Sequence, residues 1–170
     1  KRIKGHKVSL PAFNFQRTPS NISQVADNEE HIEDISAYIH EYLISKGFLY
    51  SEENIKNLYL SLLSKPFVIL SGISGTGKTK IVELFAEAVG ATVENGRFKL
   101  IPVRPDWSDS TDLLGYKDLK NDFIQGPLTK MIIHAYENPD FPHFVVLDEM
   151  NLARVEYYLS DFLSVIESRK

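Results

Sequence analysis

The sequence predicts an α/β fold of three layers, with helices on both faces of a central parallel sheet. A glycine-rich loop over residues 72–79 lies between an apolar run, Phe67–Leu70, and an amphipathic segment, in the order strand, loop, helix. A second run, Phe144–Leu147, precedes two carboxylates and is apolar throughout, which is typical of a central parallel strand. Residues 28–65 show helical periodicity, so we expect a helical hairpin before the sheet.

Residues 1–27 differ from the rest of the chain. Their basic side chains are balanced only by Asp27, and prolines interrupt any periodicity. We predict a linker or the end of an upstream domain here. A nucleic-acid-binding arm is the alternative, and it is disfavoured because aromatic side chains are limited to Phe13 and Phe15.

Residues 28–65 are the predicted helical lead-in. Apolar side chains recur at three- and four-residue spacing from Asn28, and Gly47 is expected to end this first helix. Ser51 is suited to cap a second helix, which ends at Lys65-Pro66. The expected buried positions are Ile32, Ile35, Ile39, Tyr42 and Leu43 in the first helix, and Ile55, Leu58, Leu62 and Leu63 in the second.

The turn between these two helices carries Phe48, Leu49 and Tyr50. Two interpretations fit this turn equally well. Either the side chains pack within the helical hairpin, or the turn wraps the purine base of a bound nucleotide, with Leu49 and Tyr50 as the contacts.

The glycine-rich loop has the sequence of a phosphate loop, G-x-x-x-x-G-K-T. Its glycines let the backbone bend until N–H groups converge on phosphate oxygens, and the following helix adds positive potential there. Lys78 is expected to reach the β- and γ-phosphates, and the Thr79 hydroxyl to ligate Mg²⁺. A chance turn is the alternative, which the complete match disfavours. The predicted nucleotide-binding residues are Gly72, Ile73, Ser74, Gly75, Thr76, Gly77, Lys78, Thr79 and Lys80, with Leu49 and Tyr50 for the base.

Asp148 and Glu149 directly follow the second apolar run. Ligands of parallel sheets bind at the carboxyl ends of the strands, so this acidic pair is expected to face the phosphate loop. We assign Asp148 to Mg²⁺ through its water shell, and Glu149 and Lys78 to catalysis, with Glu149 polarising the attacking water. Alone, such a pair is often only a helix cap. Together with the loop, it indicates a nucleoside triphosphatase.

Local signals predict the remaining elements. Gly90 is expected to end the helix after the phosphate loop, and Arg97–Val103 to form another strand. Residues 117–125 are polar and predicted to protrude, with a turn at Asn121-Asp122. Pro127 is expected to begin a helix. Ser108 or Asp109 is expected to cap a short helix, and a final amphipathic helix to bury Leu159, Phe162, Leu163 and Ile166.

Composition narrows the class of protein. At 170 residues and 43% hydrophobic content, the chain is one domain or slightly more, with enough apolar side chains for a core. A net charge of −4 disfavours a generally basic nucleic-acid-binding surface, although a local patch stays open. Without cysteine there is no disulfide, and no apolar stretch approaches the ~20 residues of a membrane helix. We therefore expect a cytoplasmic protein without a membrane partner.

Three segments together resemble a known family: Phe67–Thr79, Val103–Tyr116 and Val145–Glu167. They include Arg104-Pro105-Asp106-Trp107 and Leu147-Asp148-Glu149-Met150-Asn151-Leu152-Ala153-Arg154. The chain is similar to the AAA+ ATPases with an insertion in helix 2, and within them to the McrB-type NTPase subunits of modification-dependent restriction systems. The resemblance implies a P-loop NTPase core over residues 66–170, of which this is the N-terminal part. It also implies that the protrusion between Gly115 and Gly126 is the helix-2 insertion.

The resemblance further implies a homo-oligomeric ring, usually a hexamer, with nucleotide at its subunit interfaces. The implied partners are a McrC-like nuclease subunit and DNA, which is read by an N-terminal domain. The implied cofactors are Mg²⁺ with ATP or GTP. The Asn-Lys-x-Asp guanine motif is absent, yet McrB itself uses GTP, so the base stays open with a slight preference for ATP.

Two other functions stay open. One is a MoxR-like chaperone ATPase that acts on proteins. The other is a nucleotide-gated oligomerisation scaffold without turnover. The scaffold is disfavoured because Lys78, Thr79, Asp148 and Glu149 are all intact, and a scaffold that only binds nucleotide need not keep Glu149.

The family fold continues with a further strand between the phosphate-loop strand and the Asp-Glu strand, then an arginine finger and a helical lid. A parallel sheet without its central strand leaves backbone groups unpaired. Either this is a truncated piece of a longer protein, which we favour because the chain begins at Lys1 and ends at Lys170, or the missing strand comes from another molecule. Nucleotide binding is expected to survive better than hydrolysis, because an arginine finger accounts for large rate factors.

Two residues after the acidic pair allow different roles. Asn151 either orients Glu149 or the attacking water, or it caps the last helix, and N-cap preferences favour the cap. Arg154 either reaches the phosphates of a neighbouring subunit or pairs on the surface with Glu156 or Asp161. The surface pair is the default interpretation.

Overall fold

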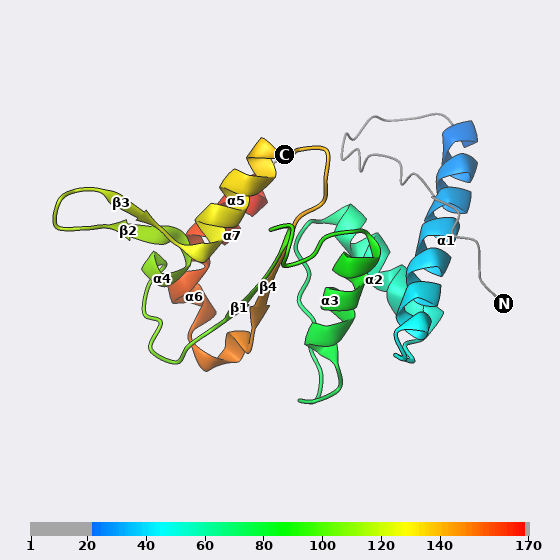
Figure 1. Cartoon of the computed structure of the whole chain (residues 1–170), viewed down its shortest axis with the longest axis horizontal. Coiled ribbons are helices and arrows are strands. Elements are labelled where there is room, and N and C mark those ends of the chain that lie inside the picture. Colours follow the sequence, from blue (N-terminus) through cyan, green and yellow to red (C-terminus); the bar gives the residue numbers. More distant parts are fainter. Residues whose placement is uncertain (1–21, 169–170) are drawn as a thin grey trace. The chain divides into compact units, whose positions relative to one another are not determined.

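The computed structural model describes residues 22–168, whose helices and strands are shown in Figure 1. The chain divides into two compact units, one running to Ser71 and one beginning at Gly72. The predicted linker, residues 1–27, lies outside the described residues except for its last positions, which are helical. No helix in the described range is long and apolar enough to cross a bilayer.

The first unit contains two helices, α1 (Ile22–Ser45) and α2 (Glu52–Ser64). α1 begins before the start that was expected at Asn28. Gly47 follows α1 with a φ of 85°, a left-handed conformation that costs glycine little. Gly47 thus ends the helix as the sequence predicts.

The two helices pack against each other through apolar side chains. Ser51 caps α2 as predicted, because its hydroxyl accepts the backbone N–H of Asn54 at 3.2 Å. The predicted face of α2 is partly wrong, since Leu62 and Leu63 are not buried whereas Tyr59 is. The buried side chains of this unit are Ile35, Ser36, Ile39, Leu43, Ile55, Leu58 and Tyr59.

The second unit is built on two parallel strands, β1 (Phe98–Pro102) and β4 (Phe144–Asp148). Both confirm the strands that the sequence predicts. Their register pairs Pro102 with Asp148, so the two strands end at the same edge of the sheet. In parallel sheets this is the edge where ligands bind.

Helices lie on both sides of this strand pair, with α3 (Lys78–Ala88) on one side and α5 (Pro127–Glu137) and α7 (Ser160–Ser168) on the other (Figure 1). On the α3 side, the rings of Phe85 and Phe144 meet edge-on with centroids 6.0 Å apart. α5 begins at its proline as predicted. The core beneath α3 joins Ala86, Ala91 and Phe98 with Val82, Phe144 and Val146.

The predicted protrusion is an antiparallel hairpin of β2 (Gly115–Lys117) and β3 (Phe123–Gln125), preceded by the short helix α4 (Thr111–Leu114). Asn121 lies in the predicted turn with a φ of 67°, and the Asp118 carboxylate accepts two backbone N–H groups there. The hairpin is less polar than expected. Its exposed apolar side chains are Tyr116, Leu119, Phe123 and Ile124.

The final helix that the sequence predicts is present as α7, which carries Phe162, Leu163 and Ile166, but it does not follow the acidic pair directly, because β4 is followed by three short segments. They are the 3₁₀ helix η1 (Met150–Leu152), α6 (Val155–Tyr158) and α7. Ala153 separates η1 from α6 in an extended conformation, with φ −124° and ψ 165°, which interrupts helical hydrogen bonding. Alanine has the highest helix propensity, so no local signal marks this break.

Phe67–Leu70 is not a strand, which corrects the prediction for this run. The segment follows α2 as irregular chain, and both Ile69 and Leu70 are exposed. A strand needs a neighbour that pairs with its backbone, and hydropathy does not show whether one is present. The sheets of the described residues join β1 with β4 and β2 with β3, without this segment.

Candidate active site

The phosphate loop leads directly into the first turn of α3. Gly75 and Gly77 have φ values of 80° and 83°, in the left-handed region where a side chain would be strained. Gly77 is the N-cap of α3, which begins at Lys78. The first N–H groups of a helix lack intrahelical partners and, with the helix dipole, attract anions. The loop therefore has the backbone conformation that its predicted role requires.

The ammonium group of Lys78 is held against the same loop. Its Nζ donates to the carbonyl oxygens of Gly72 at 3.0 Å and Ile73 at 2.8 Å. The Thr76 hydroxyl donates to the same Ile73 carbonyl at 2.9 Å. All three contacts join residues of the loop to one another, so the loop is organised locally. A phosphate bound to the loop N–H groups would lie beside the positive charge of Lys78.

Thr79 and Asp148 bring the two predicted halves of the site together. Thr79 Oγ1 donates to Asp148 Oδ1 at 2.8 Å, although 69 positions separate these residues in the sequence. Thr79 belongs to the first turn of α3, and Asp148 is the last residue of β4. The structure thus places the first member of the acidic pair against the phosphate loop.

These two oxygen ligands fit a magnesium ion. Mg²⁺ prefers oxygen, keeps several waters and takes further oxygens from bound phosphates, so one hydroxyl and one carboxylate are a sufficient protein contribution. The Thr79 and Asp148 oxygens already lie in contact. Among residues 22–168, no group of three or more His, Cys, Asp or Glu could hold a metal. An ion at this point would therefore depend on phosphate oxygens as well.

Glu149 follows Asp148 in a left-handed conformation, with φ 53° and ψ 46°. Such a conformation costs a residue with a side chain on the order of 1 kcal/mol or more. The Glu149 side chain is exposed. An exposed carboxylate beside a residue that could hold a metal ion is placed to accept a proton from water.

Comparison with known proteins decides the family. The family described as AAA domain (dynein-related subfamily) matches residues 67–170, which include the phosphate loop and the acidic pair. The chain belongs to the AAA+ family of ATPases. Its fold is therefore the α/β fold of P-loop NTPases, as the sequence predicts, with a parallel sheet that is incomplete in the described residues.

Two curated relatives are similar to this AAA+ chain. It is 31% identical over 121 residues to the protein named Chaperone MoxR1 of Mycobacterium tuberculosis, covering 69% of the chain and 28% of the relative. It is 26% identical over 123 residues to the uncharacterized protein SH1500 of Staphylococcus haemolyticus, covering 67% of the chain and 42% of the relative. The chain spans less than half the length of either relative. The finer resemblance to McrB-type subunits is not confirmed by these matches.

The predicted base contacts, Leu49 and Tyr50, belong to the first unit, whereas the AAA+ phosphate loop belongs to the second. The rings of Phe48 and Tyr50 stack with centroids 6.4 Å apart, and His40 Nε2 donates to the Tyr50 carbonyl at 2.9 Å. Leu49 is 91% exposed, so packing within the hairpin does not account for its side chain. Its contact with a base stays a prediction.

In three other predicted binding residues, the side chain either pairs with another residue of the protein or is exposed to solvent. Lys80 forms an ion pair with Glu83 at 3.0 Å along α3. Ile73 is 81% exposed, and Ser74 is exposed as well. Because its side chain is apolar, Ile73 can bind a phosphate oxygen only through its backbone N–H.

The predicted roles of Asn151 and Arg154 need correction. Asn151 lies inside η1, and Arg154 is the N-cap residue of α6, so the predicted cap by Asn151 is wrong. Arg154 donates to the Tyr157 hydroxyl at 3.2 Å and lies 5.7 Å from the centre of that ring. An aromatic ring three residues along the chain therefore takes the place of the expected carboxylate partners, Glu156 and Asp161.

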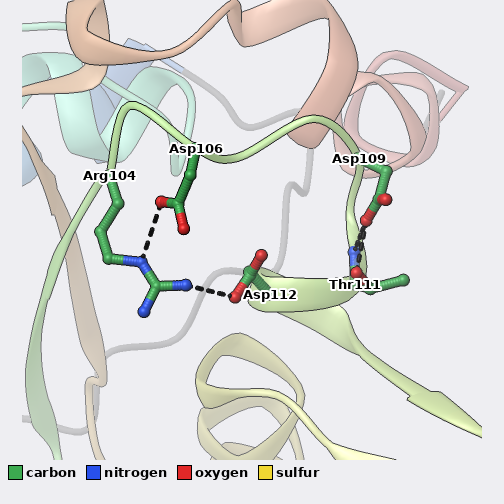
Figure 2. A network of polar contacts seen from close by, with 5 residues as sticks. All are labelled: Arg104, Asp106, Asp109, Thr111 and Asp112. Carbon is green, nitrogen blue, oxygen red and sulfur yellow. Dashed lines mark hydrogen bonds and ion pairs between the residues drawn. The ribbon is translucent and has the colours of Figure 1, made fainter.

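Sequence reasoning missed a polar cluster just beyond β1, shown in Figure 2. The Arg104 guanidinium pairs with Asp106 at 3.2 Å and with Asp112 at 2.8 Å, and so ties the loop to α4. Asp109 lies in the same loop, and its carboxylate accepts hydrogen bonds from the hydroxyl and the backbone N–H of Thr111. These bonds, the one from the hydroxyl most of all, lower the pKa of the Asp109 carboxyl. Several carboxylates lie near Arg104 in the sequence, so spacing alone does not select its partners.

Proposed function

We propose that this chain binds a nucleoside triphosphate with Mg²⁺ and hydrolyses it, as the motor part of an AAA+ protein. The observation that carries the proposal is the 2.8 Å contact between Thr79 Oγ1 and Asp148 Oδ1, which joins the phosphate loop and the acidic pair. The loop N–H groups and Lys78 hold the phosphates, and Glu149 takes a proton from the attacking water. Thr79 and Asp148 would hold Mg²⁺, which would supply positive charge to neutralise the phosphates.

Glu149→Gln tests the catalytic assignment. Glutamine has the shape of glutamate but does not accept the proton. Turnover should therefore fall by about 100-fold or more, while nucleotide affinity changes less than about twofold. Glu156→Gln, at an exposed position of α6, is the matched control and should leave both quantities unchanged. Turnover in Glu149→Gln equal to that of the control would refute the assignment. Nucleotide-dependent assembly without any turnover would support a scaffold instead.

For the nucleotide we propose ATP ahead of GTP. Calorimetric titration of the chain with each nucleotide and Mg²⁺ compares the two bases directly, and Lys78→Ala should abolish binding of both. Leu49→Ala should weaken binding of the preferred nucleotide if Leu49 contacts the base. Equal affinity for ATP and GTP, unaffected by Leu49→Ala, would reject the proposed base contact.

For the whole protein we propose a hexameric ring that serves a McrBC-like DNA restriction complex, with a McrC-like nuclease subunit and DNA as partners. The sequence resemblance of the three motif segments supports this role. A MoxR-like chaperone ATPase is the second candidate, and the 31% identity to the protein named Chaperone MoxR1 favours it. Stimulation of turnover by modified DNA together with a McrC-type subunit would favour the first role. Stimulation by an unfolded protein client would favour the second.

A further inference from the structure

The turn that carries Glu149 is held by hydrogen bonds to consecutive carbonyl groups. The Asp148 carbonyl accepts the N–H of Val103 at 3.0 Å, which continues the pairing of β1 with β4. The Glu149 carbonyl accepts the N–H of Leu152 at 3.0 Å, which closes the 3₁₀ turn. Both bonds come from backbone donors and would form with many different sequences.

The next carbonyl is held by a side chain. Tyr158 Oη donates to the Met150 carbonyl at 3.1 Å, and Tyr158 is fully buried. Burial raises the pKa of the Tyr158 phenol, so the hydroxyl stays protonated and remains a donor. A left-handed residue with a side chain persists only where its surroundings impose that conformation. The Tyr158 hydroxyl is the side-chain group that contacts the backbone immediately after Glu149.

Trp107 supports the Tyr158 ring from the loop after β1. The two rings meet edge-to-face, with centroids 5.3 Å apart and an interplanar angle of 71°. Trp107 is 6% exposed, and its buried indole Nε1 has no hydrogen-bond partner among residues 22–168, so packing determines the position of the ring. The loop that carries Trp107 is the one that Arg104 ties down with its ion pairs (Figure 2).

We propose that Tyr158, supported by Trp107, is a positioning residue that holds Glu149 in its left-handed conformation and so aims the Glu149 carboxylate at the attacking water. The catalytic consequence rests on the proposed hydrolytic function, whereas the backbone geometry can be measured without it. The contacts described for Tyr158 and Trp107 do not involve the phosphate loop. A change in Tyr158 is therefore expected to alter turnover and to spare nucleotide binding.

Tyr158→Phe removes only the hydroxyl group. We expect kcat to fall about three- to tenfold, the effect of losing one buried hydrogen bond, while KM and nucleotide affinity change less than about twofold. Tyr157→Phe is the matched control, because it removes the adjacent hydroxyl, which contacts the exposed Arg154 side chain. Its kcat should equal that of the unaltered chain. A kcat in Tyr158→Phe equal to that of Tyr157→Phe would overturn the proposal.

Nuclear magnetic resonance measures the backbone of Glu149 without any need for turnover. A positive φ brings the amide hydrogen close to the Hα of the same residue and gives a strong NOE between them. The unaltered chain and Tyr157→Phe should show this NOE at Glu149, and Tyr158→Phe should weaken it. An undiminished NOE in Tyr158→Phe would overturn the proposal. If the unaltered chain hydrolyses no nucleotide, the proposed function fails while this NOE still decides the role of Tyr158.

Two further comparisons separate positioning from general stabilisation. In a Glu149→Gln background, Tyr158→Phe should cause no additional loss of turnover, because there is no carboxylate left to aim. A general loss of folded protein would lower turnover and nucleotide binding together in both backgrounds. If Tyr158→Phe does not fold, Trp107→Phe takes its place. It should weaken the Glu149 NOE, and an unchanged NOE in that variant would overturn the proposed support.

Discussion

The two halves of the candidate site are held in different ways. The phosphate loop has its positive φ values at glycines, and the contacts of Lys78 and Thr76 bind carbonyls of the loop itself. The acidic turn has its positive φ at Glu149, and Val103 and Tyr158 bind the carbonyls on either side of that residue. One half is organised by neighbours in sequence, and the other by residues from other elements.

This difference explains why the sequence predicts the backbone conformation of the phosphate loop but not that of the acidic turn. Glycine adopts a left-handed φ without steric strain, so the glycines of the phosphate loop predict its backbone conformation from the sequence. A glutamate in the same region is strained, and the strain persists only because tertiary contacts impose it. Backbone strain of this kind is common at positions where a side chain is needed for function, which agrees with the role proposed for Glu149.

Among the variants that test this comparison, one that removes the contact between the two halves should give the largest effect. Thr79→Val removes the hydroxyl that meets Asp148 and should weaken binding of Mg²⁺ with ATP by about 10- to 100-fold, the usual range for changes around a metal site. Calorimetry with Mg²⁺ and with a chelator measures the difference. In chelator the variant and the unaltered chain should bind ATP equally. An equal loss in both conditions would mean that the loop, and not the ion, was disturbed.

Gly75→Ala tests the claim that the loop depends on glycine. A Cβ at this position would have no atom within 4 Å, so backbone strain at φ 80° is the only added cost. The free energy of unfolding should fall by about 1–2 kcal/mol, as measured by urea denaturation. No loss of stability would show that the loop relaxes readily and is less well defined than its local contacts indicate.

Glu149→Gly tests the acidic turn, and it should raise the free energy of unfolding, whereas Gly75→Ala should lower it. Relief of the left-handed strain should raise the free energy of unfolding by up to about 1 kcal/mol, partly offset by the greater freedom of glycine in the unfolded chain. Glu149→Ala is the matched control, because it removes the carboxylate but keeps the strain. Equal stability of the two variants in urea would show that the turn carries no strain.

At the other end of β4, His143 directly precedes the strand and contacts His134 of α5. His143 Nδ1 donates to the Phe141 carbonyl at 2.9 Å, so its Nε2 accepts from His134 Nδ1, also at 2.9 Å. Burial is the main reason that the pKa of His143 lies below its ordinary value of 6.5, and the nearby His134 and Arg97 act in the same direction. The folded state therefore binds fewer protons than the unfolded chain as the pH falls.

A lowered histidine pKa predicts stability that is present above about pH 6.5 and lost as the pH falls toward the pKa of the folded state. Urea denaturation between about pH 8 and pH 5 should show this loss in the unaltered chain, and a smaller loss in His143→Gln. The comparison removes the contribution of carboxylates, which both proteins share. The same slope in both proteins would exclude His143 as its source.

The Arg104 cluster should give the smallest effect. The Arg104 side chain is 58% exposed, and exposed ion pairs contribute at most about 1 kcal/mol to the free energy of unfolding. Asp112→Asn should lower the free energy of unfolding by less than that in dilute buffer and by almost nothing in 1 M salt, where the Debye length is about 3 Å. Asp106→Asn is the parallel variant for the other pair. A loss that persists in salt would mean that Asp112 stabilises the loop through packing or hydrogen bonds.

The sequence by itself determined the features that depend on neighbouring residues. The phosphate loop has its glycines where positive φ values occur, Ser51 caps α2, Gly47 ends α1, and Pro127 begins α5. The runs that form β1 and β4 were also recognisable, because a buried strand must be apolar along its length. Family membership followed from the same motifs. Each of these features rests on steric or hydrogen-bonding preferences that act within a few residues.

The tertiary structure decided what depends on distant partners. Phe67–Leu70 is as apolar as β4 yet forms no strand, because pairing needs a neighbour that hydropathy does not reveal. The break at Ala153 opposes local propensity. The left-handed φ of Glu149 and its support by Tyr158 arise where separate elements meet. Contacts between elements depend on how those elements pack in three dimensions, and residues that are far apart in the sequence carry no local sign of such contacts.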